Sequence, residues 1–414
     1  MGSSFAALGL SPALVQAAAE RGYAEPTPIQ AAAIPAALQG RDVIGCAHTG
    51  SGKTAAFGLA LLHHLGLSKR PAWRRIHGLV LVPTRELAVQ VGDTIRALSS
   101  RLPDPVKVAV LFGGVSVNPQ MMGLRGGADV VVATPGRLLD LVSRNAVRLH
   151  DVSLLVLDEA DRLLDEGFAD ELARLTALLP PRRQGLFFSA TFPPAVQALA
   201  GSLLRDPVRV EVPATATTGA PAITQQALEV DAARRTPLLR RLIEQHQWER
   251  VLVFVATRYT SEHVADKLCR AGLAAAAFHG DLSQGARTRV LDDFRNGTLR
   301  VVLATDMAAR GLHIAGLPVV VNYDLPRSAV DYTHRIGRTA RAGATGLAVS
   351  FVSAATEAHF RLIEKRQGQR VPRERVAGFE PSEAAVPAPP AGGGVKGRRK
   401  SKKDKLREAA ARGG

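Results

Sequence analysis

Residues 47–54, Ala-His-Thr-Gly-Ser-Gly-Lys-Thr, decide the fold of this chain together with the residues on either side. Val43 and Ile44 before the stretch predict a short buried strand, and Ala55 to Leu62 after it predict a helix. A strand, a glycine-rich loop and a helix N-terminus in this order bind anions, because backbone N–H groups point at the bound group. The stretch therefore predicts an α/β fold with a phosphate-binding loop.

Two side chains of this loop carry its chemistry. We expect Lys53 to reach the β- and γ-phosphates of a nucleotide and the Thr54 hydroxyl to ligate Mg²⁺. The usual pattern has glycine five residues before Gly52, where Ala47 stands, and a flexible surface loop is the alternative for such a stretch taken alone. The expected phosphate-loop residues are Ala47, His48, Thr49, Gly50, Ser51, Gly52, Lys53 and Thr54.

A second segment, Leu154 to Asp161, makes the surface-loop alternative unattractive. Its four apolar residues predict a buried strand, and carboxylates at the carboxyl end of such a strand are where a parallel sheet presents ligands. We expect Asp158 to hold Mg²⁺ and Glu159 to orient or deprotonate the attacking water. An acidic surface turn would not follow four consecutive apolar residues. The two segments together predict a nucleoside triphosphatase.

The bulk composition limits the class of protein. The 414 residues, 46% of them apolar, are enough for two domains, and the formal net charge of +16 favours a polyanionic partner such as nucleic acid, ribosome or membrane surface. No apolar run approaches the roughly 20 residues that span a bilayer, and residues 1–10 lack the features of a signal peptide. The two cysteines have no metal-binding spacing. We expect a cytoplasmic protein without structural zinc and without a membrane partner.

Short apolar stretches alternate with helical patterns in two parts of the chain and predict a parallel sheet in each. The first part has strand candidates at Gly78 to Val82, Val106 to Phe112, Val130 to Ala133, Leu154 to Leu157, Gly185 to Phe188 and Val208 to Val212. The second has them at Val251 to Val255, Ala274 to Phe278, Val301 to Ala304, Val319 to Asn322 and Gly346 to Val352. We expect a first domain over 1–212, a flexible linker over 213–224 and a second domain, without a phosphate loop of its own, over 225–365.

Residues 366–414 differ in composition from the rest. They contain 13 Lys and Arg against five Asp and Glu, so +8 of the net charge lies there. The Pro, Ala, Gly and basic content predicts a disordered tail that grips polyphosphate nonspecifically; a solubilising or address segment is the alternative.

The order and spacing of further motifs resemble the DEAD-box RNA helicases over about residues 5 to 350, with Asp158-Glu159-Ala160-Asp161 as the name-giving tetrapeptide. The resemblance implies two tandem RecA-like domains, ATP and Mg²⁺ as cofactors, and sequence-nonspecific binding of single-stranded RNA or short duplexes. It implies an adenine-recognising element made of Phe5, Tyr23, Thr27 and Gln30, and a second-domain nucleotide contact at Asp306. A Gln amide can pair with both edges of adenine, which would favour ATP.

The same resemblance assigns RNA-backbone contacts to loops that follow predicted strands. Hydroxyls, glycine N–H groups and arginines suit phosphates and sugars rather than base edges. The implied RNA-binding residues are Pro83, Thr84, Arg85, Gly113, Gly114, Thr134, Pro135, Gly136 and Arg137 in the first domain, and Thr257, Arg258, Gly280, Gln284, Arg287, Thr305 and Arg310 in the second.

A final group of motifs would couple hydrolysis to domain movement. The implied coupling residues are Asp161, Ser189, Thr191, His334 and Arg341. Arg335 and Arg338 lie three apart on a predicted helix, and the resemblance implies that both act as arginine fingers on the γ-phosphate. Two positions depart from the family pattern: His313 stands where most relatives carry Asp, and Ala340 where Gly is usual.

The resemblance implies an ATP-dependent RNA helicase that clamps single-stranded RNA, opens short duplexes, remodels RNA–protein complexes and releases RNA on hydrolysis. We expect a monomer of the bacterial RhlE-like subgroup, acting on ribosomal precursors or mRNA-decay assemblies. Two alternatives stay open. One is an RNA-annealing factor or ribosome-associated scaffold that works through its basic tail, and the other is a DNA-directed motor.

Overall fold

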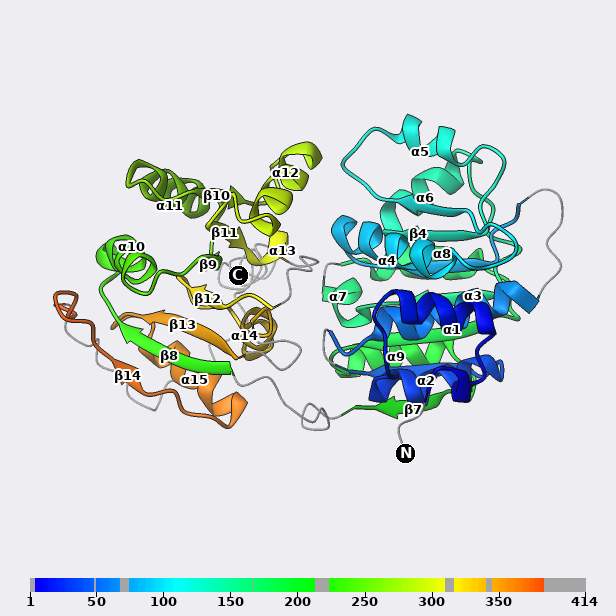
Figure 1. Ribbon diagram of the computed structural model, residues 1–414, viewed down its shortest axis with the longest axis horizontal. Helices are drawn as coiled ribbons and strands as arrows, with labels where there is room; N and C mark the ends of the chain where they lie inside the picture. The colour runs from blue at the N-terminus through cyan, green and yellow to red at the C-terminus, as the bar shows by residue number, and fades with distance from the viewer. Residues whose placement is uncertain are drawn as a thin grey trace, which may run out of the picture.

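The computed structural model describes residues 4–47, 50–67, 74–165, 167–212, 223–309, 316–339 and 345–382. It has two lobes that face each other, each a seven-stranded parallel sheet with helices on both sides (Figure 1). This confirms the predicted α/β fold with two tandem parallel-sheet domains. His48, Thr49, Arg310, His313, Ala340 and Arg341 lie outside the described residues, as does nearly all of the predicted linker and the Lys/Arg-rich part of the tail.

The first domain runs from the N-terminus to β7. Its strands are β1 (Val43–Cys46), β2 (Gly78–Leu81), β3 (Val108–Leu111), β4 (Val130–Ala133), β5 (Leu154–Leu157), β6 (Gln184–Ser189) and β7 (Val208–Glu211). Its helices are η1 (Ala6–Leu8), α1 (Pro12–Glu20), α2 (Pro28–Leu38), α3 (Lys53–Leu67), α4 (Arg85–Leu98), α5 (Val117–Gly123), α6 (Pro135–Ser143), α7 (Ala160–Asp165), α8 (Ala169–Ala177) and α9 (Pro194–Leu203).

The second domain begins at β8. Its strands are β8 (Ile223–Glu229), β9 (Val251–Val255), β10 (Ala275–Phe278), β11 (Val301–Thr305), β12 (Val319–Asn322), β13 (Gly346–Val352) and β14 (Arg373–Glu374). Its helices are η2 (Ala232–Arg234), α10 (Arg235–Gln245), α11 (Arg258–Arg270), α12 (Gln284–Arg295), α13 (Asp306–Ala309), α14 (Ala329–Ile336) and α15 (Glu357–Gln367).

Continuous apolar strands explain why both faces of each sheet are covered. In β2 and β5 every residue is buried, with Val80 and Val156 packing into the core on one face and Leu79 and Leu155 into the core on the other. The strand orders are β3-β4-β2-β5-β6-β1-β7 and β10-β11-β9-β12-β13-β8-β14. All neighbours are parallel, so the loops after the strands gather at one edge of each sheet.

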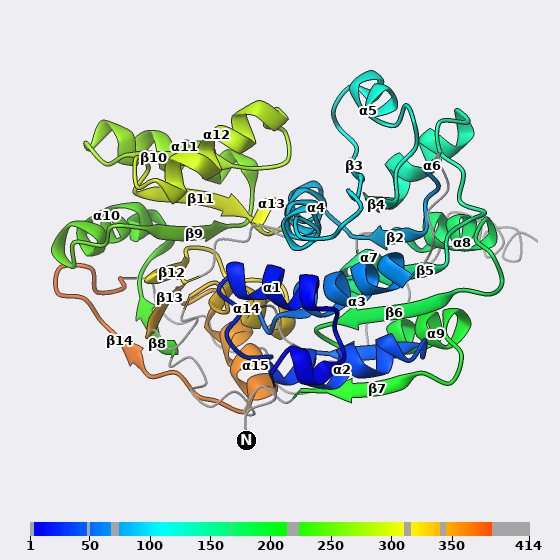
Figure 2. The same ribbon diagram turned by 45° about the vertical axis from the view of Figure 1, so that its right-hand side comes forward.

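These loop-bearing edges turn toward each other. In Figure 2 the arrowheads of β6, β7 and β11 point toward the junction of the two domains. The segments after β2 and β11, in different domains, also line one pocket. The fold therefore brings the ligand loops of both sheets to a shared cleft. Within the residues that the structure describes, no helix has both the length and the apolar character needed to cross a membrane.

The second domain is longer than predicted at both ends. β8 begins at Ile223, inside the predicted linker, and residues 366–382 belong to the domain rather than to a disordered tail. Arg373 holds the returning segment in place: it forms ion pairs with Glu357 and Glu364 at 2.9 Å, and its guanidinium lies over the Phe360 ring. The structured segment extends past the predicted boundary at residue 366, because Arg373, a basic residue in this segment, is a half-buried partner of two glutamates on α15.

Candidate active site and nucleic-acid interface

The phosphate loop between β1 and α3 contains two backbone conformations that favour glycine. Gly50 and Gly52 have φ of 89° and 95°, in the left-handed region. A Cβ on Gly52 would stand 2.4 Å from Nε2 of Gln30, so the loop also needs the missing side chain. Lys53, buried at the start of α3, donates from Nζ to the Ala47 carbonyl at 2.6 Å. Its ammonium group is therefore held at the first residue of the phosphate loop.

The predicted adenine element is tied to this loop through Gln30. Its Oε1 accepts the Thr27 N–H at 2.9 Å and its Nε2 donates to the Gly52 carbonyl at 3.1 Å. The Thr27 and Ser51 hydroxyls are buried and lack a hydrogen-bond partner among the described atoms, which fits a polar ligand bound here. Phe5 is buried in the core, and Tyr23 packs against that core. These two aromatic residues support the element by packing.

The metal-binding prediction concerns Asp158, at the end of β5. Its side chain is buried, Oδ1 accepts the Glu159 N–H at 3.0 Å, and burial raises its pKa to about 7, against the opposing charge of Lys53. A carboxylate that loses solvation in this way gains from a bound cation. Asp158 and the Thr54 hydroxyl supply the hard oxygen ligands that Mg²⁺ prefers, so the residues present fit the ion.

Glu159 adopts φ of 51°, an uncommon left-handed conformation for a residue other than glycine. Its Oε2 accepts from Nη1 of Arg162 at 2.7 Å, and both side chains are more than 90% buried. Arg162 was missed in the sequence analysis. The signal that could have found it is its spacing of three from Glu159 at the start of α7.

The predicted coupling residues of the first domain are in contact. Asp161 Oδ2 accepts the Thr191 amide at 3.0 Å and the Thr191 hydroxyl at 2.7 Å. The Ser189 hydroxyl accepts the Asp161 N–H at 3.2 Å. His334, on α14 of the second domain, is held largely uncharged: burial lowers its pKa to about 4, with Arg162 adding to this and Asp161 opposing it. His334 and Arg162, from different domains, line one small cavity.

The two predicted arginine fingers have different surroundings. Arg335 is buried and bonded within its own domain: Nε and Nη2 donate to Asp306 at 2.6 and 2.7 Å, and Nη1 donates to Asn322 Oδ1 and the Asp324 carbonyl at 3.1 and 2.6 Å. These contacts leave little capacity for a phosphate, so the geometry disfavours Arg335 as a finger. They also occupy both carboxylate oxygens of Asp306, the predicted nucleotide contact.

Arg338 lies near the first domain. It lines a small interdomain cavity of about 20 Å³ together with Arg162, Asp306 and His334. Arg335 lines the same cavity, so the two predicted fingers differ in the bonds that Arg335 makes within its own domain rather than in their distance from the first domain.

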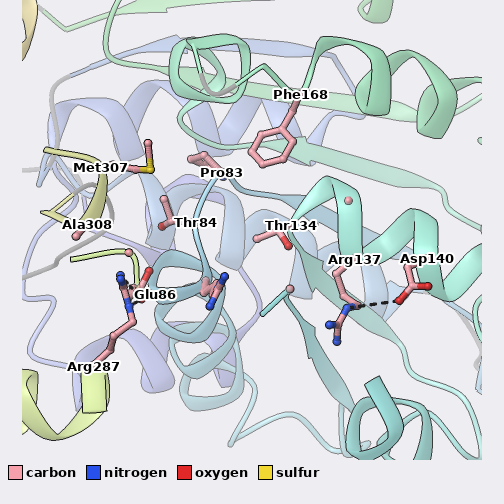
Figure 3. Close-up of a pocket in the computed structure, with 14 residues that line it drawn as sticks. Pro83, Thr84, Glu86, Thr134, Arg137, Asp140, Phe168, Arg287, Met307 and Ala308 are labelled. Atoms are coloured by element: carbon pink, nitrogen blue, oxygen red, sulfur yellow. Dashed lines mark hydrogen bonds and ion pairs between the residues drawn. The ribbon is translucent and has the colours of Figure 1, made fainter. Parts of the chain in front are cut away.

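A larger pocket of about 470 Å³ collects many of the predicted RNA-binding residues from both domains. Figure 3 shows Thr84, Thr134, Arg137 and Arg287 around it. From the predicted set it is lined by Pro83, Thr84, Arg85, Gly113, Thr134, Gly136, Arg137, Gly280 and Arg287. Gly114, Pro135, Thr257, Arg258, Gln284 and Thr305 are described but do not line it.

Local contacts explain two features of this pocket. A Cβ on Gly114, whose φ is 74°, would collide with the Arg85 guanidinium, so this glycine lets Arg85 lie flat against the loop. Arg137 donates from Nη2 to the Val115 carbonyl at 2.7 Å, while its buried Nη1 has no hydrogen-bond partner in the described part of the chain. That orphaned cationic donor suits a phosphate.

One ion pair crosses the pocket between the domains. Arg287 Nη2 lies 2.6 Å from Glu86 Oε1, and both side chains are at most 10% exposed. Arg287 also donates from Nη1 to the His279 carbonyl at 3.1 Å and stacks on Phe278 at 4.5 Å. Glu86 was not among the predicted residues. Its carboxylate neutralises the charge of Arg287, which was predicted to bind RNA.

Comparison with known proteins agrees with this geometry. The profile described as DEAD/DEAH box helicase matches residues 27–199, and that of the helicase conserved C-terminal domain matches residues 234–343. The chain is 45% identical to the ATP-dependent RNA helicase DbpA of Escherichia coli strain K12, covering 83% of this chain and 73% of that protein. It is 39% identical to the DEAD-box ATP-dependent RNA helicase CshA of Bacillus cereus, covering 90% and 69%. Dbp5 of S. cerevisiae bound to RNA and ADP BeF3 superposes with a TM-score of 0.79 at 32% identity, covering 90% of this chain and 95% of that one.

Proposed function

We propose, on the premise that this chain belongs to the DEAD-box family of ATP-dependent RNA helicases, that it clamps single-stranded RNA between its two domains. Clamping would open short duplexes, because a strand held in the cleft is withdrawn from its partner. The observation that supports this most strongly is the 470 Å³ pocket, which takes Arg85 and Arg137 from one domain and Arg287 from the other. RNA bound there would hold the domains together.

The catalytic residues lie at the same junction. Lys53 and the loop amides would bind the phosphates, and Glu159 would orient or deprotonate water, with Arg162 fixing the direction of its carboxylate. Bound Mg²⁺, held by Thr54 and Asp158, would supply charge neutralisation of the phosphate oxygens. Arg338 would add a positive charge from the second domain. The site is complete only when the domains are closed.

Release would follow from the contacts around Asp161. This carboxylate links α7 to Thr191 within the first domain, and His334 of the second domain lies close to it. Departure of the cleaved phosphate after hydrolysis would weaken the hold on Arg338 and allow the domains to separate. Remodelling of RNA–protein complexes would use the same cycle. The RhlE-like subgroup, a monomeric state, a cytoplasmic location and roles in ribosome biogenesis or RNA turnover stay predictions from the sequence.

The test is the Glu159→Gln substitution. It keeps the size of the side chain and one oxygen that can accept from Arg162 but removes the base, so RNA and ATP binding should persist while turnover slows by about 10² or more. Binding is measured by fluorescence anisotropy with labelled RNA, and turnover by phosphate release. Unchanged turnover would remove Glu159 from its assigned role.

A further inference from the structure

One exposed aromatic residue of the second domain is not explained by the function proposed above. Tyr259 is 70% exposed, although large apolar side chains are usually covered. Its ring stacks on that of His263, one turn further along α11, with centroids 5.5 Å apart and planes 10° from parallel. The two rings form a flat surface on the helix, which we call the Tyr259–His263 platform.

The platform continues from the RNA pocket through a short series of contacts. Gly280 lines the pocket, and its neighbour Asp281 forms an ion pair with Arg258. Arg258 directly precedes Tyr259 and is the first residue of α11. Thr257, the N-cap, accepts the Thr260 N–H at 3.0 Å, which fixes the start of the helix. The platform therefore stands on the first turns of a capped helix, whose first residue pairs with the chain neighbour of a pocket-lining glycine.

We infer that the Tyr259–His263 platform stacks one nucleobase of the RNA strand where it passes out of the pocket over the second domain. A positively charged groove followed by an aromatic face is the arrangement with which proteins hold single strands without reading sequence. His263 stacks on the Tyr259 ring and limits its rotation, which lowers the entropy lost on stacking, and Arg258, which precedes Tyr259, is held in place by its pair with Asp281. The inference rests on the proposed function, because it extends the same RNA path.

The test measures binding of the full chain to fluorescein-labelled single-stranded RNA oligonucleotides, with Mg²⁺ and a non-hydrolysable ATP analogue. One series carries a single abasic nucleotide at each successive position. For the unmodified chain, one abasic position near an end of the bound segment should weaken binding about fivefold or more. Tyr259→Ala should weaken binding of the intact strand by a similar factor. In this variant the same abasic position should then cost nothing further.

Two variants serve as controls. Tyr259→Phe keeps a stacking face and should bind like the unmodified chain. Leu362→Ala removes another exposed apolar side chain, 60% exposed on α15, and should have no effect. Equal binding of Tyr259→Ala and the unmodified chain, or an abasic penalty that persists in Tyr259→Ala, would overturn the inference. Failure of the unmodified chain to bind RNA in the presence of nucleotide would instead overturn the proposed function.

Discussion

The two domains share one sheet order, yet the residues after the corresponding strands β1 and β8 differ: they form a glycine-rich loop in the first domain and include a buried carboxylate in the second. The strand order of the second sheet repeats that of the first with an offset of seven. After β1 the chain forms a loop with Gly50, Gly52 and Lys53. After the equivalent β8 it reaches Asp231, a buried carboxylate that accepts the amide of Ser382 at 2.9 Å and its hydroxyl at 2.7 Å. A phosphate at this second position would meet a negative charge.

A second difference between the domains lies after the corresponding strands β5 and β12. Asp158 follows β5 and Asp324 lies just beyond β12. Asp324 Oδ1 lies 2.8 Å from Arg235 Nη1, and its Oδ2 accepts the Ala256 N–H at 2.8 Å. Asp158 has Lys53 nearby and a pKa raised by burial. The shared topology places a carboxylate at the same edge of each sheet. The ion pair with Arg235 makes Asp324 a stabilising residue, whereas Asp158 is the candidate ligand for Mg²⁺.

The largest expected effect separates Arg338 from Arg335. Arg338→Ala should lower RNA-stimulated turnover about 10³-fold, because under the proposed function it removes a positive charge that would face the phosphates. Arg335→Ala should instead destabilise the second domain by up to about 3 kcal/mol, since it leaves the partly buried carboxylate of Asp306 without its partner. Thermal unfolding and phosphate release measured on both variants make the comparison. A larger fall in melting temperature for Arg338→Ala than for Arg335→Ala would reverse the two assignments.

A middle-sized effect is expected at the contact between the domains. Glu86→Gln removes the carboxylate opposite Arg287 and leaves the arginine in place. The closed state should be less populated, so the RNA concentration at half-maximal ATPase should rise about tenfold while the maximal rate is kept. Glu244→Gln, which breaks the exposed pair with Arg240 on α10, is the matched control and should change neither value. An unaltered RNA dependence in Glu86→Gln would mean that the pair does not contribute to closure.

The smallest effect concerns stability and pH. The folded-state pKa of Asp158 is raised from 3.8 to about 7, so between these values the folded state binds more protons and loses stability as the pH rises. Without nucleotide and Mg²⁺, Asp158→Asn should therefore raise the melting temperature at pH 8 by about 2 °C or more, and by less at pH 5. Asp324→Asn should lower it, because it weakens the pair with Arg235. Scanning calorimetry at both pH values decides the matter; a lower melting temperature for Asp158→Asn at pH 8 would contradict the account.

Most strands were predictable from the sequence, and β8 and β14 were not. Val130–Ala133 and Leu154–Leu157 agree residue for residue, because each strand is buried on both faces. β8 was missed because Gln225 and Gln226 break its apolar pattern in a half-buried strand. β14 was missed because it has only two residues and is held by the ion pairs of Arg373, whose partners are in α15.

The candidate site shows the same limit. Motif spacing places Lys53, Asp158 and Glu159 on the correct loops, since the strands before them fix the geometry. It also predicted a common helix face for Arg335 and Arg338, which was wrong because α14 ends at Ile336 and Arg338 lies beyond its C-cap, Gly337. The sequence could not show that Asp306, 29 residues away along the chain, binds Arg335, or that Arg162 binds Glu159. Side-chain partners depend on how helices and strands pack together, and a local sequence pattern does not contain that information.

The most direct test of the central claim is the steady-state rate of ATP hydrolysis by the full chain. It is measured without nucleic acid, with single-stranded RNA and with DNA of the same sequence, and Glu159→Gln provides the blank. The account predicts a low rate alone and strong stimulation by RNA, because RNA completes a site that neither domain has by itself. Hydrolysis that is equally fast without RNA would contradict a site assembled by closure of the two domains.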